Sequence, residues 1–188
     1  MSNMNRLEEA FHTVTRGDFV ANELRGQADL DAPLPIGYGQ TISQPTTVRL
    51  MLSWLDAKCG DKVLDVGSGS GWTTALLANI VGPHGVVYAV ERIPQLVEFG
   101  RDNCRRLGME NAFFFQAGRQ YGLRRYAPYA RILVSASAHE LPTELLSQLA
   151  ISGKLVVPVQ NDILEITKTA GGKYQTRTHP GFVFVPLV

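Results

Sequence analysis

The pattern of hydrophobic positions changes character at Lys62. From there onward, short apolar runs alternate with amphipathic stretches, which is typical of strands and helices that follow one another in a parallel α/β sheet. The predicted strands are Lys62–Val66, Val86–Val90, Ala112–Gln116, Arg131–Ser135, Lys154–Val159, Ile163–Thr169 and Gly181–Leu187. The predicted helices are Trp72–Val81, Pro94–Leu107 and Pro142–Ala150.

The last two predicted strands are joined differently from the others. Only Ala170–Pro180 separates them, and it contains Gly171 and Gly172, which suits a hairpin better than a crossover helix. We therefore expect an antiparallel pair at one edge. The predicted fold class is α/β, a doubly wound, mostly parallel sheet with an antiparallel edge strand.

The segment before Lys62 has another pattern. Residues 4–24 carry apolar side chains at roughly helical spacing and break at Gly17, whereas glycines and prolines interrupt residues 26–45, which predicts an extended segment. Thr46–Ala57 is predicted as an amphipathic helix, with an apolar face formed by Val48, Met51, Leu52 and Leu55.

Length and composition fit one globular domain. The 188 residues are 45% hydrophobic, which is enough to bury a core. We predict a single domain over 1–188, in which 1–57 form a helical and extended cover over the ligand site and 58–188 form the sheet. The net charge of +1 gives no basic excess, so neither nucleic acid nor a membrane is an expected partner.

Cysteine usage and the first residues indicate the compartment. Cys59 and Cys104 are too few for a disulfide framework and are not spaced as a metal site. Met1–Glu9 is polar and lacks the apolar core of a signal peptide. We therefore expect a cytoplasmic monomer without a metal ion.

A glycine-rich turn follows the first strand of the predicted sheet, with the sequence Asp65-Val66-Gly67-Ser68-Gly69-Ser70-Gly71-Trp72. Glycines in such a turn permit positive φ and let a ligand approach the backbone, and the following helix offers free N–H groups. A dinucleotide fingerprint would need its third glycine at position 72. The spacing D-x-G-x-G-x-G instead resembles the first motif of class I methyltransferases, in which the loop cradles the amino-acid end of the cofactor and Asp65 would engage its ammonium, directly or through water.

An acidic residue ends the second predicted strand. Glu91 lies about 20 residues past the glycines, where a carboxylate can accept hydrogen bonds from both ribose hydroxyls. Such a carboxylate suits any free ribose, so Glu91 alone does not separate an adenosyl cofactor from NAD. The alternatives are a solvated strand end for Glu91 and a glycine turn without a ligand.

A segment before the sheet carries a more specific resemblance. Residues 31–45, centred on Gly39-Gln40-Thr41-Ile42-Ser43, resemble the segment that marks the protein-L-isoaspartate O-methyltransferases. Further matches are Asp18-Phe19-Val20, Val90-Glu91-Arg92, Leu155–Val159 and Phe182–Leu187. The resemblance covers roughly residues 7–188 and implies a sheet of the Rossmann-like methyltransferase type.

The resemblance implies a function and a set of site residues. Enzymes of this family use S-adenosyl-L-methionine to methylate the α-carboxylate of L-isoaspartyl residues in damaged proteins or peptides, and the ester collapses to a succinimide that hydrolyses partly to aspartate. Ser43 would then lie at the active centre. The expected cofactor contacts are Thr41, Ile42, Asp65, Gly67, Ser68, Gly69, Gly71, Glu91, Arg92, Ala117 and Gly118. An ionised carboxylate needs alignment and desolvation more than acid–base catalysis.

Several positions depart from the family pattern. Gln116-Ala117-Gly118 stands where the family has Gly-Asp-Gly, whose aspartate meets the adenine, and Ala136-Ser137-Ala138-His139 replaces Ala-Ala-Pro-Pro. Two alternatives therefore stay open: a related methyltransferase that acts on another carboxylate or small molecule, and a cofactor-binding homologue with weak or no catalysis. For Ser43 the alternative is a loop serine that satisfies backbone groups.

Overall fold

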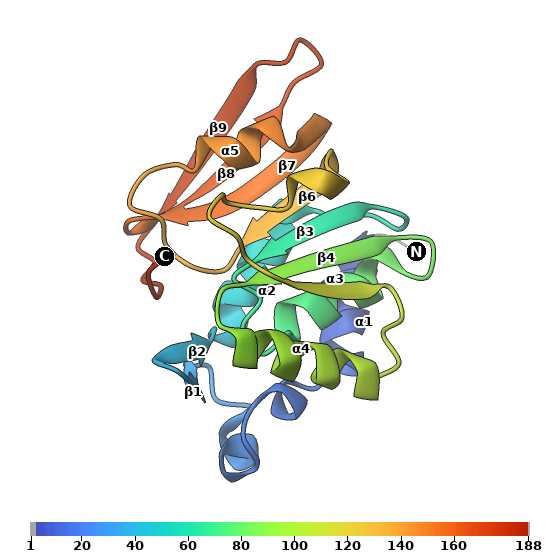
Figure 1. Ribbon diagram of the computed structural model, residues 1–188, viewed down its shortest axis with the longest axis vertical. Helices are drawn as coiled ribbons and strands as arrows, with labels where there is room; N and C mark the ends of the chain where they lie inside the picture. The colour runs from blue at the N-terminus through green and yellow to red at the C-terminus, as the bar shows by residue number, and fades with distance from the viewer. Residues whose placement is uncertain (1–2, 188) are drawn as a thin grey trace.

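The computed structural model describes residues 3–187, so residues 1–2 and 188 of the predicted domain lie outside the described part. A seven-stranded sheet is built from β3 (Lys62–Val66), β4 (Val86–Glu91), β5 (Ala112–Gln116), β6 (Tyr129–Val134), β7 (Leu149–Val159), β8 (Asp162–Lys168) and β9 (Tyr174–Pro180). Its strand order is β5-β4-β3-β6-β7-β8-β9 (Figure 1). The helices are α1 (Asn3–Thr13), α2 (Pro45–Leu55), α3 (Trp72–Val81), α4 (Pro94–Arg106) and α5 (Thr143–Ser147), with 3-10 helices η1 (Arg16–Phe19), η2 (Asn22–Gln27) and η3 (Arg124–Tyr126).

The direction of the strands confirms the predicted fold class. The five strands from β5 to β7 run parallel, whereas β8 is antiparallel to both β7 and β9. The hairpin of β8 and β9 therefore forms the expected antiparallel pair at one edge. No helix among the described residues is both long and apolar enough to cross a membrane.

The position of the last strand was predicted wrongly. Residues 181–187 form an irregular segment, and the edge strand is β9 in the stretch expected to be a loop. Because β9 lies at the edge, nearly all of its side chains are exposed, so its polar sequence shows no alternation that predicts a strand. The apolar Phe182 and Phe184 pack against the core instead, and Ser137 N donates to Val185 O at 2.8 Å.

The other differences concern where elements begin and end. Of the helix predicted over Pro142–Ala150, only α5 is helical, because Leu149 already pairs with Tyr129 in the β6–β7 ladder. The N-terminal helical stretch is divided among α1, η1 and η2. The predicted extended segment contains a small antiparallel hairpin, formed by β1 (Leu34–Gly37) and β2 (Gln40–Ile42).

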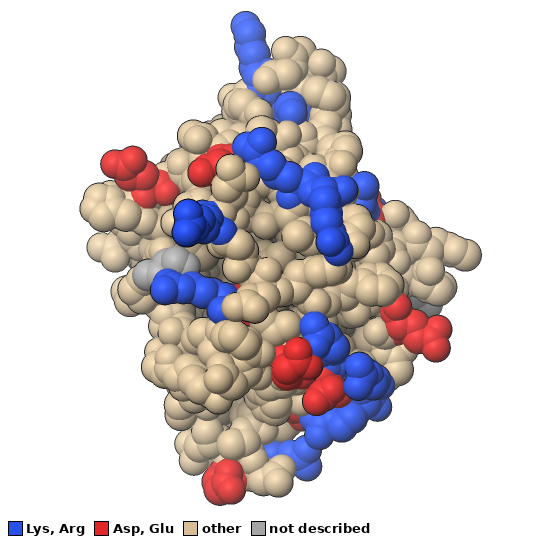
Figure 2. All heavy atoms as spheres, viewed as in Figure 1, with Lys and Arg blue, Asp and Glu red and all other residues tan. Residues whose placement is uncertain are grey.

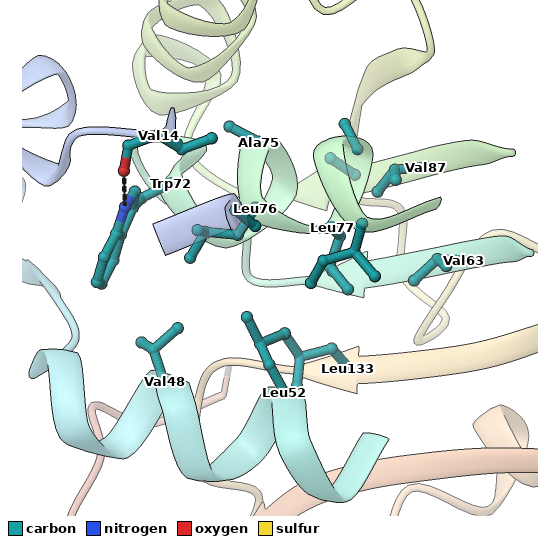
Figure 3. Packing of buried hydrophobic residues seen from close by; sticks show 14 of the residues in the cluster. Val14, Val48, Leu52, Val63, Trp72, Ala75, Leu76, Leu77, Val87 and Leu133 are labelled. Atoms are coloured by element: carbon teal, nitrogen blue, oxygen red, sulfur yellow. Dashed lines mark hydrogen bonds between the residues drawn. The ribbon is translucent and has the colours of Figure 1, made fainter. Parts of the chain in front are cut away.

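Alternation along the strands divides the core between the two faces of the sheet. Val63 and Leu133 face one cluster, which α1 to α4 cover, whereas Leu64 and Ile132 face the other, which α5 covers. Figure 3 shows the first cluster, in which apolar residues of α2 and α3 close over the sheet. This layer brings the N-terminal segment against the turn that precedes α3.

Gly100 in α4 tests how tightly the helix packs against that turn. A Cβ at this position would lie 2.7 Å from Phe114 Cε1, 3.2 Å from Gly69 O and 3.3 Å from Gly71 N. Gly100→Ala should therefore destabilise the fold by about 1–3 kcal/mol in urea unfolding, although alanine normally stabilises a helix by about 0.5–1 kcal/mol over glycine. The control is Gly26→Ala, where a Cβ meets nothing within 4 Å and stability should stay unchanged or rise slightly. Equal stabilities for the two variants would contradict this packing.

Candidate active site

The glycine turn has the conformation that its sequence predicts. Gly67, Gly69 and Gly71 have φ of +76°, +52° and +89°, which other residues rarely adopt. Gly71 also lies against α4, since a Cβ there would meet Gly100 Cα and O at 3.0 Å. Backbone hydrogen bonds from Gly67 N and Ser68 N to Val90 O, at 2.9 and 3.2 Å, attach the turn to β4.

The carboxylate of Asp65 lies beneath this turn and is fully buried. Its Oδ2 accepts hydrogen bonds from Thr73 Oγ1 at 2.9 Å and Thr74 Oγ1 at 2.6 Å, both in the first turn of α3. Its Oδ1 has no hydrogen-bond partner among the described residues. Burial raises the pKa of Asp65 to about 6, although the two threonine hydroxyls act in the opposite direction.

The carboxylate of Glu91 joins the turn to the end of β4. Oε2 accepts from Gly69 N at 3.0 Å, and Oε1 accepts from Arg92 N at 2.7 Å and Ile93 N at 3.0 Å. The residue is only 8% exposed, so it is not the solvated strand end that was the alternative. A carboxylate offers about four acceptor positions, so room remains for a ligand hydroxyl.

A cavity of about 840 Å³ opens at the carboxyl ends of β3 to β6, where ligands bind in sheets of this kind. Of the predicted cofactor contacts, it is lined by Thr41, Gly67, Gly69, Glu91, Arg92, Ala117 and Gly118. A recess of about 30 Å³ shares Thr41 and the glycine turn with this cavity, and it is lined by Ile42, Ser43 and Ser68 as well. Asp65 and Gly71 line neither space: Asp65 lies beneath the turn, and Gly71, the last glycine of the turn, lies against α4.

Several residues that line the cavity were not predicted from the sequence as contacts of the cofactor. Ile36 and Gln40 come from the β1–β2 hairpin, Tyr121 comes from the loop after β5, and 185–187 come from the C-terminal segment. Residues 185–187 were not predicted to line a site, because their apolar pattern predicted a strand instead. Trp72 also lines the recess, while its indole N–H points to Val14 O at 3.5 Å (Figure 3).

Ser43 is held by a side chain that the sequence did not single out. It lies between β2 and α2, and its carbonyl accepts a hydrogen bond from Arg16 Nη2 at 3.2 Å. The same guanidinium donates to Ala28 O at 2.9 Å and Ala32 O at 2.7 Å. The N-terminal segment is therefore fixed as a wall beside the glycine turn.

The donors and acceptors of this site fit a ligand with an ammonium group and a ribose. Ser68 Oγ, in the wall of the recess, has no partner among the described residues, and Glu91 keeps acceptor capacity. Asp65 Oδ1 also has no partner among these residues, but it lies beneath the turn and lines neither space. The cavity volume is typical of a small-molecule site. In the described part of the chain, no group of three or more His, Cys, Asp or Glu side chains could hold a metal ion.

The fold and the site together define a Rossmann-like class I methyltransferase. A sequence profile described as protein-L-isoaspartate(D-aspartate) O-methyltransferase matches residues 1–188. A protein-L-isoaspartate O-methyltransferase from Methanopyrus kandleri is 44% identical over 98% of this chain and 84% of its own length. The chain belongs to this family, as its sequence predicted.

Solved structures agree with this assignment. A structure named protein-L-isoaspartate O-methyltransferase superposes on this one with a TM-score of 0.90 at 25% sequence identity. The match covers 98% of this chain and 61% of the other chain. A Plasmodium falciparum protein described as a protein-L-isoaspartate O-methyltransferase, in complex with S-adenosyl-L-homocysteine, gives a TM-score of 0.84 at 28% identity over 98% of this chain and 90% of its own.

The buried carboxyl of Asp65 predicts a specific dependence of stability on pH. Because folding raises the pKa of Asp65 from its ordinary 3.8 to about 6, the folded state binds the proton more tightly than the unfolded state. The contribution of this tighter proton binding to the free energy of unfolding is complete below pH 3.8 and is lost as the pH rises through about 6. Asp65→Asn removes the titration, so the difference in unfolding free energy between variant and wild type should shift by roughly 3 kcal/mol across this window. Urea unfolding at several pH values measures it; a constant difference would contradict the raised pKa.

Proposed function

We propose that this chain transfers the methyl group of S-adenosyl-L-methionine to the α-carboxylate of L-isoaspartyl residues in damaged proteins or peptides. The observation that carries the proposal is the place of Ser43 and its neighbours, which lie in a recess directly beside the glycine turn. The names of the curated relatives, 40–46% identical to this chain, support it.

The chain divides cofactor binding among three places. The glycine turn, with Ser68 Oγ and Asp65 Oδ1 still unpartnered, would receive the amino-acid end. Glu91 would accept from the ribose hydroxyls, and Ala117 and Gly118 would border the adenine. When bound, the cofactor supplies a methyl group already activated on a sulfonium.

The remaining task of the protein is alignment and exclusion of water. An acceptor carboxylate is ionised at neutral pH, so no general base is needed. The hairpin residue Ile36 and the C-terminal residues 185–187 line the cavity and would reduce the access of water to a bound ligand. The hydroxyl of Ser43 would hold the acceptor carboxylate by a hydrogen bond, and its half-buried position strengthens that bond.

We also infer a cytoplasmic monomer whose partners do not include nucleic acid or a membrane. Both cysteines are free thiols, and Cys59 is exposed. The net charge of +1 gives no basic excess that would attract a polyanion. Figure 2 shows one face of the molecule, on which Lys and Arg as well as Asp and Glu side chains lie.

The function is tested by transfer of a tritiated methyl group to matched peptides that differ only in an isoaspartyl or aspartyl linkage. We expect methylation of the isoaspartyl peptide and little of the aspartyl peptide, because the two backbones place the carboxylate differently. Calorimetry with S-adenosyl-L-homocysteine accompanies the assay. Tight cofactor binding without transfer to either peptide would refute the proposal and favour a changed acceptor or a protein that only binds the cofactor.

Replacement of Ser43 separates acceptor alignment from cofactor binding. Ser43→Ala should lower methyl transfer roughly ten- to a hundred-fold, because a hydrogen bond to a charged group contributes about 1.5–3 kcal/mol. The affinity for S-adenosyl-L-homocysteine should stay within a few-fold. The matched control is Ser53→Ala, an exposed serine of α2 whose hydroxyl donates to Leu50 O at 2.8 Å. An unchanged rate in Ser43→Ala would remove Ser43 from the reaction.

A further inference from the structure

Arg16 is a buried cation that is solvated by the main chain. The residue is 5% exposed, and its Nη1 donates to Ala28 O at 2.9 Å and Leu30 O at 3.2 Å. Nη2 donates to Ala32 O at 2.7 Å and Ser43 O at 3.2 Å. Within the described part of the chain, every acceptor of these bonds is a backbone carbonyl and none is a carboxylate.

This arrangement differs from the usual treatment of buried charge. A buried arginine is normally paired with an acid, because its desolvation is costly. Here the guanidinium lies 5.5 Å from the centre of the Trp72 ring, and Asp31 and Asp29 act on it only at longer range. The fork of fixed N–H donors therefore serves to hold carbonyl groups in a set geometry.

The groups that Arg16 joins belong to different parts of the site. Ala28 to Ala32 form the loop before the β1–β2 hairpin, Ser43 follows the hairpin, and Trp72 opens the helix behind the glycine turn. One side chain thus sets where the segment with Ser43 lies relative to the turn. Lysine has a single ammonium and cannot reproduce a planar set of donors to these carbonyls.

We propose that Arg16 is a positioning residue for methyl transfer, which acts through Ser43 by fixing the N-terminal segment against Trp72. This inference rests on the proposed function. Displacement of a reacting group by about 1 Å can cost on the order of 10²-fold in rate. Of the predicted cofactor contacts, Glu91 and the glycine turn come from other elements and would stay in place. Thr41 and Ile42 belong to the segment that Arg16 holds, since Nη2 also lies 3.5 Å from Ile42 O.

The test compares Arg16→Lys and Arg16→Met with wild type, alone and combined with Ser43→Ala. We expect roughly ten- to a hundred-fold lower kcat on the isoaspartyl peptide, with the Kd for S-adenosyl-L-homocysteine within a few-fold. In the Ser43→Ala background the same substitutions should cost much less, because the group that they misplace is already missing. The control is Arg25→Lys, an exposed arginine that pairs with Asp18 at 3.4 Å and should leave kcat unchanged.

Each other outcome has a distinct meaning. Losses that add fully to those of Ser43→Ala, or an unchanged kcat, would overturn the positioning role. Methionine fills the buried site without a charge, and such replacements of buried ionic groups often keep the fold. If neither variant binds S-adenosyl-L-homocysteine, Arg16 is required for folding and the proposal is also lost. An inactive wild type would instead refute the proposed function, so the two failures are distinguishable.

Discussion

The interaction on which the rest of the site depends is the buried contact between Asp65 and the first turn of α3. A carboxylate at the end of a central strand loses its water shell on folding, and local hydrogen-bond donors can offset part of that cost. Thr73 and Thr74 supply those donors and thereby fix where α3 begins. The glycine turn connects Asp65 to α3, so this contact fixes both ends of the turn. The backbone groups of the turn are therefore held in place before any ligand binds.

A second carboxylate completes the turn from the neighbouring strand. Glu91 accepts from Gly69 N, so the loop after β3 is bonded to the end of β4. Two adjacent parallel strands therefore hold one loop through side chains that sit at the same edge of the sheet. The close approach of Gly71 and Gly100 brings α4 against the same loop, which explains why glycine is needed in both elements. The strand ends, the turn and the two helices are therefore joined by direct contacts.

The sequence predicted those parts of the molecule whose signals are local. The parallel strands, the glycine turn and the acidic strand end each show within a short window, and the structure brings Glu91 and the turn together as expected. The edge strand β9 was missed because exposed edge residues need no apolar pattern, and 181–187 were mistaken for a strand because they pack as an irregular segment. Arg16 could not be found at all, since its partners are 12 to 27 residues away and are backbone carbonyls, which no residue type reveals.

The two halves of the site are consequently held by different kinds of contact. The proposed cofactor side is held by bonds within the strand–turn–helix unit of β3 and α3 and by bonds from its turn to the adjacent strand β4. The proposed acceptor side is held by the contacts of Arg16, which fold residues 16–43 onto Trp72. A change such as Ala117 at the cavity wall can therefore alter cofactor affinity by the value of one hydrogen bond, about 0.5–1.5 kcal/mol, without moving Ser43. Of the departures from the family pattern, Gln116 ends β5, and 117–118 and 136–139 lie in loops that follow strands; none of these residues is a hydrogen-bond partner of Arg16.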